Sequence, residues 1–252
     1  MDKLLKIKTR IGNIAGNYID CGDNKPLVII AHGRGGNRNT GSKKIAEYLQ
    51  SFGISSLRID LYGYGESDGK FENITITTAK NSVLGTLDYV QKNIKHSKLF
   101  LFGTSYGGSG ILGALSEISP STISGLIFRC TILNYLAKTH REMSEQQISD
   151  WKNNGNIDDY EGKLNYSFYD DQNNYKSVDY EKLKLFNSLY FYAGKDSKIL
   201  LSEVDELRSK LSDKLELVTY PNSVHGIDIQ EDFDDMMVKT KDFVQQIASN
   251  TL

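Results

Sequence analysis

Ser105, His225 and Asp196 are the residues whose types and order along this 252-residue chain could perform nucleophilic catalysis. Ser105 stands in the pattern Gly-x-Ser-x-Gly over residues 103–107, between an apolar run and a segment rich in small residues. A sharp turn from strand to helix with this glycine spacing lifts a serine hydroxyl clear of a sheet. The helix that follows offers its dipole and its free N–H groups to a developing oxyanion. The pattern therefore predicts Ser105 as a nucleophile.

His225 lies in a loop after the last predicted strand and before the last predicted helix. The chain order serine, acid, histidine and this position predict His225 as the general base. An imidazole in that role needs a carboxylate at its other nitrogen, which fixes the tautomer and stabilises the imidazolium. Asp196, after the strand predicted at residues 189–193, is the candidate acid, and the alternative is an aspartate that caps a helix or forms a turn. The other three histidines are predicted to be structural or on the surface.

The glycine-rich segment Gly33–Gly36 follows the first predicted buried strand. Backbone N–H groups at this position can face the nucleophile and share an oxyanion with the amide that follows the serine. Arg34 and Tyr106 are therefore predicted to act through their backbone N–H groups. The Arg34 side chain is expected to be solvated, and the alternative is a clamp for a substrate carboxylate.

Two glycine-rich segments resemble nucleotide-binding motifs. Residues 108–113 match Gly-x-Gly-x-x-Gly, but they lie inside the predicted helix after Ser105, where a pyrophosphate could not reach the turn. Residues 36–43 resemble a phosphate loop with its last two residues exchanged, so the lysine is not next to the glycine. Neither segment predicts a nucleotide site.

Short apolar runs alternate with amphipathic stretches of helical length, a pattern typical of a mostly parallel sheet with helices on both faces. The predicted class is therefore α/β. The predicted strands cover residues 4–8, 13–20, 27–31, 54–59, 98–102, 125–128, 189–193 and 215–218, and the predicted helices cover 43–52, 75–93, 105–116 and 234–248.

Residues 133–185 break this alternation and are polar, with many Tyr, Asn and Asp residues. We expect a small cap insertion here, with a helix at 144–153 and a hairpin at 163–169, in a hydrolase core formed by residues 1–132 and 186–252. Five aromatic residues of the insertion could line an acyl pocket, although packing within the cap is the favoured interpretation. They are Trp151, Tyr160, Tyr166, Phe168 and Tyr169.

The composition is that of a large globular domain, with 39% hydrophobic and 25% charged residues. The formal charge of −2 gives no basic field that would attract nucleic acid or an anionic membrane. No apolar run approaches the roughly 20 residues that span a bilayer, and the N-terminal residues do not have the pattern of a signal peptide. The two cysteines, Cys21 and Cys130, are far apart and predict neither a zinc site nor a disulfide framework. A cytoplasmic location is the expectation.

Taken together, four segments resemble the cinnamoyl and feruloyl esterase branch of the α/β hydrolases, close to the serine aminopeptidase and monoacylglycerol lipase types. The segments are residues 31–37, 58–73, 103–108 and the loop around His225. The resemblance implies a triad of Ser105, His225 and Asp196, and an oxyanion hole formed by the amides of Arg34 and Tyr106. It also implies the α/β-hydrolase fold and a structural role for Asp60.

Two positions depart from the family pattern. The acid usually stands three residues after the strand-end glycine, where this chain has Ser197, whereas Asp196 stands two residues after Gly194. Either a one-residue shift of the loop restores the acid, or the acid comes from elsewhere or is missing. Arg34 also stands where an apolar residue is common.

The predicted function is hydrolysis of a carboxylic ester with a short or aromatic acyl group, through an acyl-enzyme and without a cofactor. The predicted partner is a small-molecule ester, with no nucleic acid and no membrane span. A thioester, a monoacylglycerol or a peptide amide would use the same triad. An alternative of another class is a binding protein on this fold that has lost efficient catalysis.

Overall fold

One mixed sheet runs through the protein, and a short two-stranded hairpin lies apart from it. The computed structural model describes residues 2–249. The strands are β1 (Asp2–Thr9), β2 (Gly12–Ile19), β3 (Leu27–Ala31), β4 (Ser55–Ile59), β5 (Leu99–Thr104), β6 (Gly125–Arg129), β7 (Asn156–Asp159), β8 (Gly162–Asn165), β9 (Ser188–Ala193) and β10 (Leu215–Tyr220). The helices are α1 (Gly41–Ser51), α2 (Ile76–Asn93), α3 (Tyr106–Ala114), α4 (Tyr135–Glu142), α5 (Glu145–Asn154), α6 (Ser167–Asp171), α7 (Tyr180–Leu183), α8 (Leu201–Leu211) and α9 (Gln230–Ser249).

The main sheet has the strand order β1-β2-β4-β3-β5-β6-β9-β10. β2 pairs antiparallel with β1 and β4, and the remaining neighbours pair in parallel. Every residue of β3 and β9 is buried, as expected for parallel strands that are covered on both faces. The predicted mostly parallel sheet is confirmed, because continuous apolar runs and helical periodicity are strong local signals.

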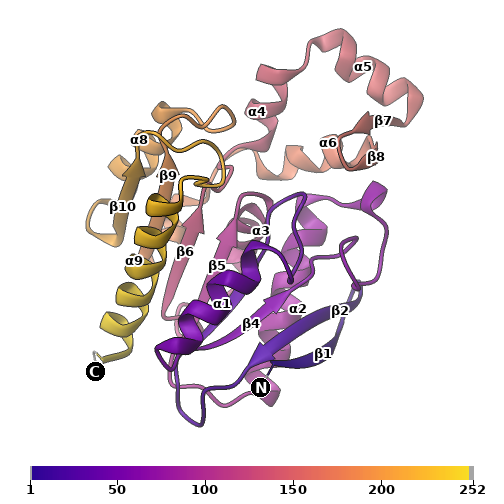
Figure 1. The fold of residues 1–252 in the computed structure, drawn as a ribbon. Coiled ribbons are helices and arrows are strands. Elements are labelled where there is room, and N and C mark those ends of the chain that lie inside the picture. The colour runs from indigo at the N-terminus through magenta and orange to yellow at the C-terminus, as the bar shows by residue number, and fades with distance from the viewer. Residues whose placement is uncertain (1, 250–252) are drawn as a thin grey trace.

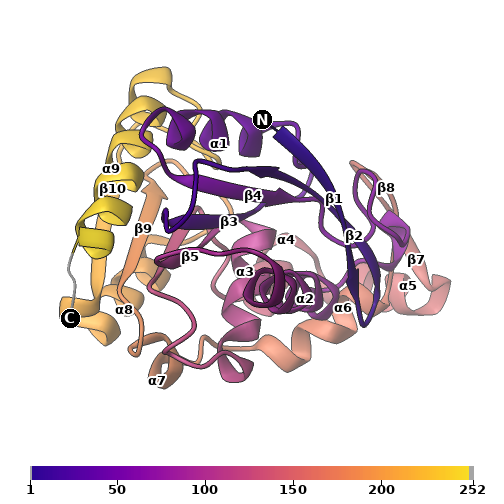
Figure 2. The ribbon, with the colours of Figure 1, turned by 90° about the horizontal axis from the view of Figure 1, so that it is seen from below.

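Helices cover both faces of the sheet. Figures 1 and 2 show α1 and α9 on one face and α2, α3 and α8 on the other. The long helix α9 buries Met236, Met237, Phe243 and Val244 against the core, at the spacing of one helical face. The sheet is therefore covered on both faces, and its edge with the loops stays open.

Residues 133–185 connect β6 to β9 and contain helices α4 to α7 and the hairpin β7–β8. Figure 1 shows α4, α5, α6 and the hairpin beyond the end of the molecule at which the parallel strands finish. The helix predicted at 144–153 is present as α5. The hairpin predicted at 163–169 is wrong, since the strands are 156–159 and 162–165 and residues 167–171 are helical. The turn is made by Tyr160 and Glu161 before Gly162, which has φ +132°, a conformation that favours glycine.

Loops that follow four of the parallel strands meet at the carboxyl edge of the sheet. Arg34 follows β3, Ser105 follows β5, Asp196 follows β9, and His225 follows β10. Ligands of open parallel sheets bind outside this edge, because the chain can vary there without disturbing the strands. The topology therefore brings together residues that are far apart in the sequence.

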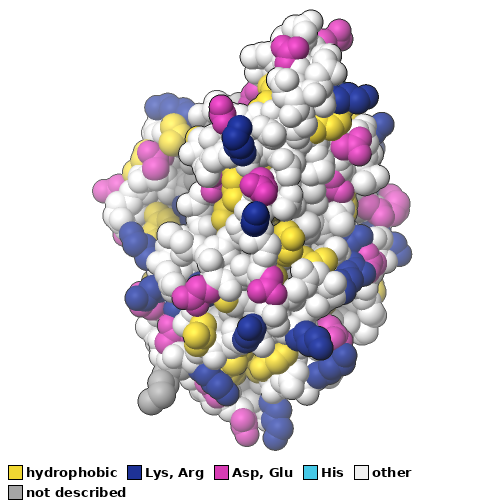
Figure 3. Space-filling view, turned by 90° about the vertical axis from the view of Figure 1, so that its right-hand side faces the viewer, with side chains coloured by type: hydrophobic (Ala, Val, Ile, Leu, Met, Phe, Trp, Pro, Cys, Tyr) yellow, Lys and Arg dark blue, Asp and Glu magenta, His cyan; other side chains and the backbone are white. Residues whose placement is uncertain are grey.

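The surface carries charges of both signs. On the face in Figure 3, basic and acidic side chains are interspersed with small hydrophobic areas. Across residues 2–249, no helix combines the length and the apolar character that crossing a membrane requires. Both cysteines are free thiols, with Cys130 buried and Cys21 partly exposed.

Candidate active site

Ser105 occupies the strained turn between β5 and α3. Its backbone has φ 46° and ψ −114°, a conformation that L-residues rarely adopt. Its N–H donates to the carbonyl oxygen of Arg129 on the neighbouring strand β6 at 2.9 Å, which holds the turn against the sheet. Strain of this kind persists only where the surroundings enforce it, and it raises the hydroxyl above the strand ends.

The glycines around Ser105 are required by space. A Cβ atom at Gly107 would lie 2.5 Å from the carbonyl oxygen of His32, and one at Gly103 would lie 2.4 Å from Cα of Gly108. Both distances are far below any real contact of a Cβ atom. The helix α3 can therefore begin this close to β3 and β5 only without side chains at these positions.

The side chains of Ser105, His225 and Asp196 form one hydrogen-bonded chain. Ser105 Oγ lies 3.0 Å from His225 Nε2, and His225 Nδ1 lies 2.7 Å from Asp196 Oδ2. The Asp196 carboxylate is fully buried, while the His225 side chain is 18% exposed. Since the carboxylate can only accept, Nδ1 carries the proton and Nε2 is free to take the serine proton. Asp196 therefore contacts His225 even though it stands one position earlier in its loop than the acid of the family pattern.

The His225 loop is held on both sides. Ser223 Oγ donates to Asp232 at 2.8 Å, and the N–H of Val224 donates to Asp228 at 3.0 Å. Gly226 and Ile227 follow with φ values of 101° and 53°. Two consecutive left-handed residues turn the chain sharply after His225, which aims the imidazole back toward Ser105.

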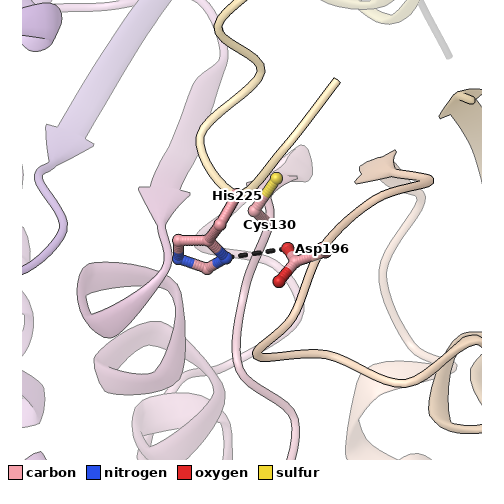
Figure 4. A group of neighbouring side chains, drawn as sticks. All are labelled: Cys130, Asp196 and His225. Atoms are coloured by element: carbon pink, nitrogen blue, oxygen red, sulfur yellow. Dashed lines mark hydrogen bonds and ion pairs between the residues drawn. The ribbon is translucent and has the colours of Figure 1, made fainter. Parts of the chain in front are cut away.

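Cys130 lies beside Asp196 and His225. Its Sγ atom and the ligand atoms of Asp196 and His225 are within 4.8 Å of one another (Figure 4). Burial, together with the smaller effect of the nearby Asp196 charge, raises the pKa of the Cys130 thiol to about 11. A metal would need the thiolate. The neutral thiol fits better as a small apolar neighbour of the Asp196–His225 hydrogen bond.

The loop Gly33–Gly36 packs against the turn at Ser105. A Cβ atom at Gly33 would lie 3.2 Å from Ser105 Cβ, so the loop approaches closely because it lacks a side chain there. Within residues 2–249, neither the N–H of Arg34 nor that of Tyr106 donates a hydrogen bond. Tyr106 is the first residue of α3, and the first N–H groups of a helix have no partner inside it. Both groups are free to donate to a ligand.

His32 connects this loop to the end of β4 by hydrogen bonds, which is a structural role. The N–H of Leu61 donates to His32 Nε2 at 3.0 Å, so Nδ1 carries the proton that is donated to Gly33 O at 2.7 Å. Asp60 is fully buried and accepts from the N–H groups of Arg38 and Glu66 at 2.7 and 2.9 Å. These contacts fix the ends of β3 and β4 beside the site.

The expectation that the Arg34 side chain is solvated is wrong. It is 14% exposed and forms ion pairs with Asp159 and Glu161 of the β7–β8 turn, the second at 3.3 Å. Glu161 also accepts the N–H of Gly35 at 2.7 Å. The carboxylates lie about 125 positions downstream, which is why no local pattern reveals the contact. Arg34 thus joins the segment 133–185 to the loop beside Ser105.

A cleft of about 430 Å³ opens over Ser105 and His225. Of the five aromatic residues considered above, all of which the structure describes, Tyr160 lines this cleft. Trp151 and Phe168 are buried in the packing of the segment, and Trp151 Nε1 donates to Leu164 O at 3.0 Å. A second cavity of about 420 Å³ lies beyond Tyr135, which lines both spaces.

Several residues that line the cleft were not predicted from the sequence. Tyr135, Arg129, Lys138 and Lys198 line the cleft together with Ser105. Arg129 ends β6 at the carboxyl edge of the sheet, and that position alone was a usable signal. The others lie in loops or short helices, where the periodicity of the sequence does not show which way a side chain points.

Comparison with known proteins supports the same fold. The structure of Est1E from Butyrivibrio proteoclasticus with ferulic acid bound superposes with a TM-score of 0.83 at 21% identity, over 98% of this chain and 100% of the other. Mouse alpha/beta hydrolase domain-containing protein 10 superposes with a TM-score of 0.78 at 17% identity, over 98% and 99% of the two chains. These likenesses establish the α/β-hydrolase fold.

Two curated proteins match part of the chain. Caffeoylshikimate esterase of Arabidopsis thaliana is 30% identical over 115 residues, which are 42% of this chain and 33% of the plant protein. An uncharacterised 31.7 kDa protein of Escherichia coli, from the traX-finO intergenic region, is 28% identical over 94 residues, 36% of this chain and 33% of that protein. The matches thus span about a third of each relative. The model of the family described as serine aminopeptidase, S33, matches residues 22–183, and the chain therefore belongs to this family of α/β hydrolases.

Proposed function

We propose that the protein hydrolyses carboxylic esters, with Ser105 as nucleophile, His225 as general base and Asp196 as the orienting acid. The observation that carries this proposal is the hydrogen-bonded chain from Ser105 Oγ to His225 at 3.0 Å and on to Asp196 at 2.7 Å. Ser105 occupies a strained turn at the open edge of the sheet, and a cleft that admits a small molecule lies over it.

In the acylation step, Ser105 Oγ attacks the ester carbonyl carbon while His225 Nε2 takes the hydroxyl proton. The carbonyl oxygen becomes an oxyanion, which accepts hydrogen bonds from the free N–H groups of Arg34 and Tyr106. The buried Asp196 stabilises the imidazolium as it forms. His225 then gives the proton to the alcohol oxygen as the bond from carbon to that oxygen breaks, and an acyl-enzyme remains.

In the second step, water attacks the acyl-enzyme. His225 takes a proton from the water, the same two N–H groups hold the new oxyanion, and the proton passes to Ser105 Oγ as the acid leaves. The reaction consumes one water and needs no group beyond the chain's own residues.

An ester is the favoured substrate among those that this chemistry serves. The curated relative that acts on caffeoylshikimate is an esterase, and Est1E was solved with ferulic acid bound. Thioesters, monoacylglycerols and peptide amides remain alternatives with the same triad. The binding-protein alternative rested on a displaced acid, and the contact between Asp196 and His225 favours the enzyme.

Residues 133–185 are proposed to act as a cap over this core of residues 1–132 and 186–252. Tyr160, Tyr135 and Lys138 from this segment line the cleft, so substrate selection would depend on it. A cytoplasmic location stays a prediction from the sequence.

A fluorophosphonate probe followed by intact mass tests the proposal without knowledge of the substrate. The wild type and Ser119→Ala, which lacks an exposed hydroxyl after α3, are expected to gain the mass of one probe, whereas Ser105→Ala gains none. A panel of acetate to long-chain esters, hydroxycinnamates, thioesters and anilides then ranks the substrates. A folded wild type that stays unlabelled would refute the proposal.

A further inference from the structure

Arg129 is a cationic side chain at the end of β6, directly beside the nucleophile. It pairs with Thr104 across the sheet, and its carbonyl oxygen accepts the N–H of Ser105 at 2.9 Å. Its side chain lines the cleft that also contains Ser105 and His225, and it lines a smaller hollow of about 190 Å³ against the loop Gly33–Gly36. Arg129 therefore borders the space where a bound ester would lie.

The guanidinium of Arg129 is poorly satisfied. Within the described residues its Nε atom is buried without a hydrogen-bond partner, and Nη2 makes only a long contact of 3.5 Å to Ile227 O. Its Cζ atom lies 5.2 Å from the centre of the Phe233 ring. Among residues 2–249 no carboxylate pairs with it. Withdrawing a cation from water without a counter-ion is costly, and an anionic ligand would remove that cost.

A second unmatched cation lines the same cleft. Lys198 is partly buried, and its Nζ has no hydrogen-bond or ion-pair partner within the described part of the chain. The other two basic residues of the cleft are matched, because Arg34 pairs with Asp159 and Lys138 pairs with Glu142. Burial lowers the pKa of Lys138, and the charges of Lys198 and Arg34 lower it further, although Glu142 raises it. Four basic side chains therefore line this cleft against two carboxylates, Asp159 and Glu142, in a chain whose formal charge is −2.

We propose that Arg129 and Lys198 bind an anionic group of the substrate, so that the enzyme prefers esters whose acyl or alcohol part carries a carboxylate. The inference rests on the proposed esterase function and names its substrate class. A guanidinium offers a planar pair of donors to a carboxylate, and an ammonium at the rim adds attraction at longer range. The interaction would hold the far end of the substrate while its carbonyl lies at Ser105.

Two pairs of esters that differ in one carboxylate test the preference. 4-Nitrophenyl hexanoate and 4-nitrophenyl hydrogen adipate differ on the acyl side, and phenyl acetate and 3-acetoxybenzoate differ on the alcohol side. The wild type is expected to have the higher kcat/KM for the anionic member of at least one pair. Arg129→Gln is expected to lower the ratio of anionic to neutral kcat/KM roughly ten- to hundredfold, the range for a hydrogen bond to a charged group. Lys198→Gln is expected to lower the ratio less.

Lys195→Gln is the matched control, because Lys195 is an exposed lysine of the same loop that does not line the cleft. It removes the same charge and is expected to keep the wild-type ratio. If Arg129 has only a structural role, Arg129→Gln lowers both activities in proportion and the ratio stays constant. If that variant does not fold, Lys198→Gln and the loss of the preference with rising salt decide the question.

Measurements of binding without hydrolysis test this inference separately from the esterase proposal. Ser105→Ala keeps each ester intact, so calorimetry gives its Kd for both members of a pair. Tighter binding of the anionic member by Ser105→Ala, and its loss when Arg129→Gln is added, support the subsite even if the wild type hydrolyses neither ester. Equal affinities together with equal kcat/KM values in both pairs overturn it.

Discussion

Asp196 Oδ2 lies 2.7 Å from His225 Nδ1, although Asp196 stands only two residues after the strand-end glycine Gly194. The other carboxylate oxygen accepts the N–H groups of Lys198 and Ile199 at 2.8 and 3.2 Å. Both oxygens are therefore held by donors, and the side chain is fully buried. The short loop after β9 fixes the carboxylate in one orientation toward the imidazole.

Replacing this carboxylate tests its role. Asp196→Asn is expected to lower kcat on the order of 10⁴-fold with little change in KM, because an amide cannot stabilise the imidazolium. Steady-state kinetics with a 4-nitrophenyl ester measure the loss, and circular dichroism checks the fold. Adding Ser197→Asp to this variant restores little, since the loop directs Asp196 and not its neighbour to His225. Near-wild-type kcat in Asp196→Asn would mean that another group is the acid.

Glu161 is expected to position the loop beside Ser105. Its carboxylate holds the N–H of Gly35 and the Arg34 side chain, and the N–H of Arg34 is a proposed oxyanion donor. Glu161→Gln weakens both contacts and should lower kcat about tenfold with a smaller effect on KM. Hydrogen exchange at residues 33–36 should become faster.

The matched control for that variant is Glu145→Gln, an exposed carboxylate on α5 with no ion pair among the described residues. It should leave kcat and the exchange of the loop unchanged. Unchanged kcat in Glu161→Gln together with faster exchange would show that the loop is ordered by the contact but that its order does not limit catalysis.

Gly107→Ala is expected to destabilise the fold. The added Cβ would lie 2.5 Å from His32 O and 2.6 Å from Ala31 O, and neither backbone atom can move without displacing β3. A decrease in the free energy of unfolding of about 1–3 kcal/mol is expected for overpacking of this kind. Urea unfolding measures it, and Gly41→Ala at the start of α1 is the control, since its Cβ would have no neighbour closer than 3.7 Å. Equal stability of the two variants would contradict the steric argument.

His32 is expected to make stability fall in mild acid. Burial lowers its pKa from the usual value of 6.5, although the Gly33 carbonyl and Asp60 act in the opposite direction. Above about pH 6.5 the imidazole is neutral in both the folded and the unfolded chain. Below that pH the unfolded chain binds a proton that the folded chain does not, so the free energy of unfolding decreases, by at most about 1.4 kcal/mol per pH unit.

Urea unfolding between pH 7.5 and about pH 5 checks this dependence. His32→Gln keeps a donor and an acceptor without titrating, so its slope should be smaller than that of the wild type. His140→Gln, at an exposed position on α4, should keep the wild-type slope. Identical slopes in the wild type and His32→Gln would exclude His32 as the source.

The local parts of the site follow from the sequence. The glycine spacing around Ser105 reflects steric contacts within five residues. The buried strands are visible in the sequence as continuous apolar runs. The position of His225 after the last strand follows from the order of elements. Each of these features depends on short-range sterics or on periodicity, which a sequence displays directly.

Other features required the tertiary structure. The orientation of Asp196 depends on a single residue of loop length, and the hairpin at 156–165 was misplaced by several residues. The partners of Arg34 are carboxylates about 125 positions away, and the isolation of Arg129 is visible only when its surroundings are known.

Sequence thus determined the fold and the places of Ser105 and His225 in it, because local sterics and apolar patterning encode them. The tertiary structure decided which carboxylate faces His225, which charges neutralise one another and which do not. The physical reason is that pairing and burial of charges depend on distances across loops whose conformations no local pattern specifies.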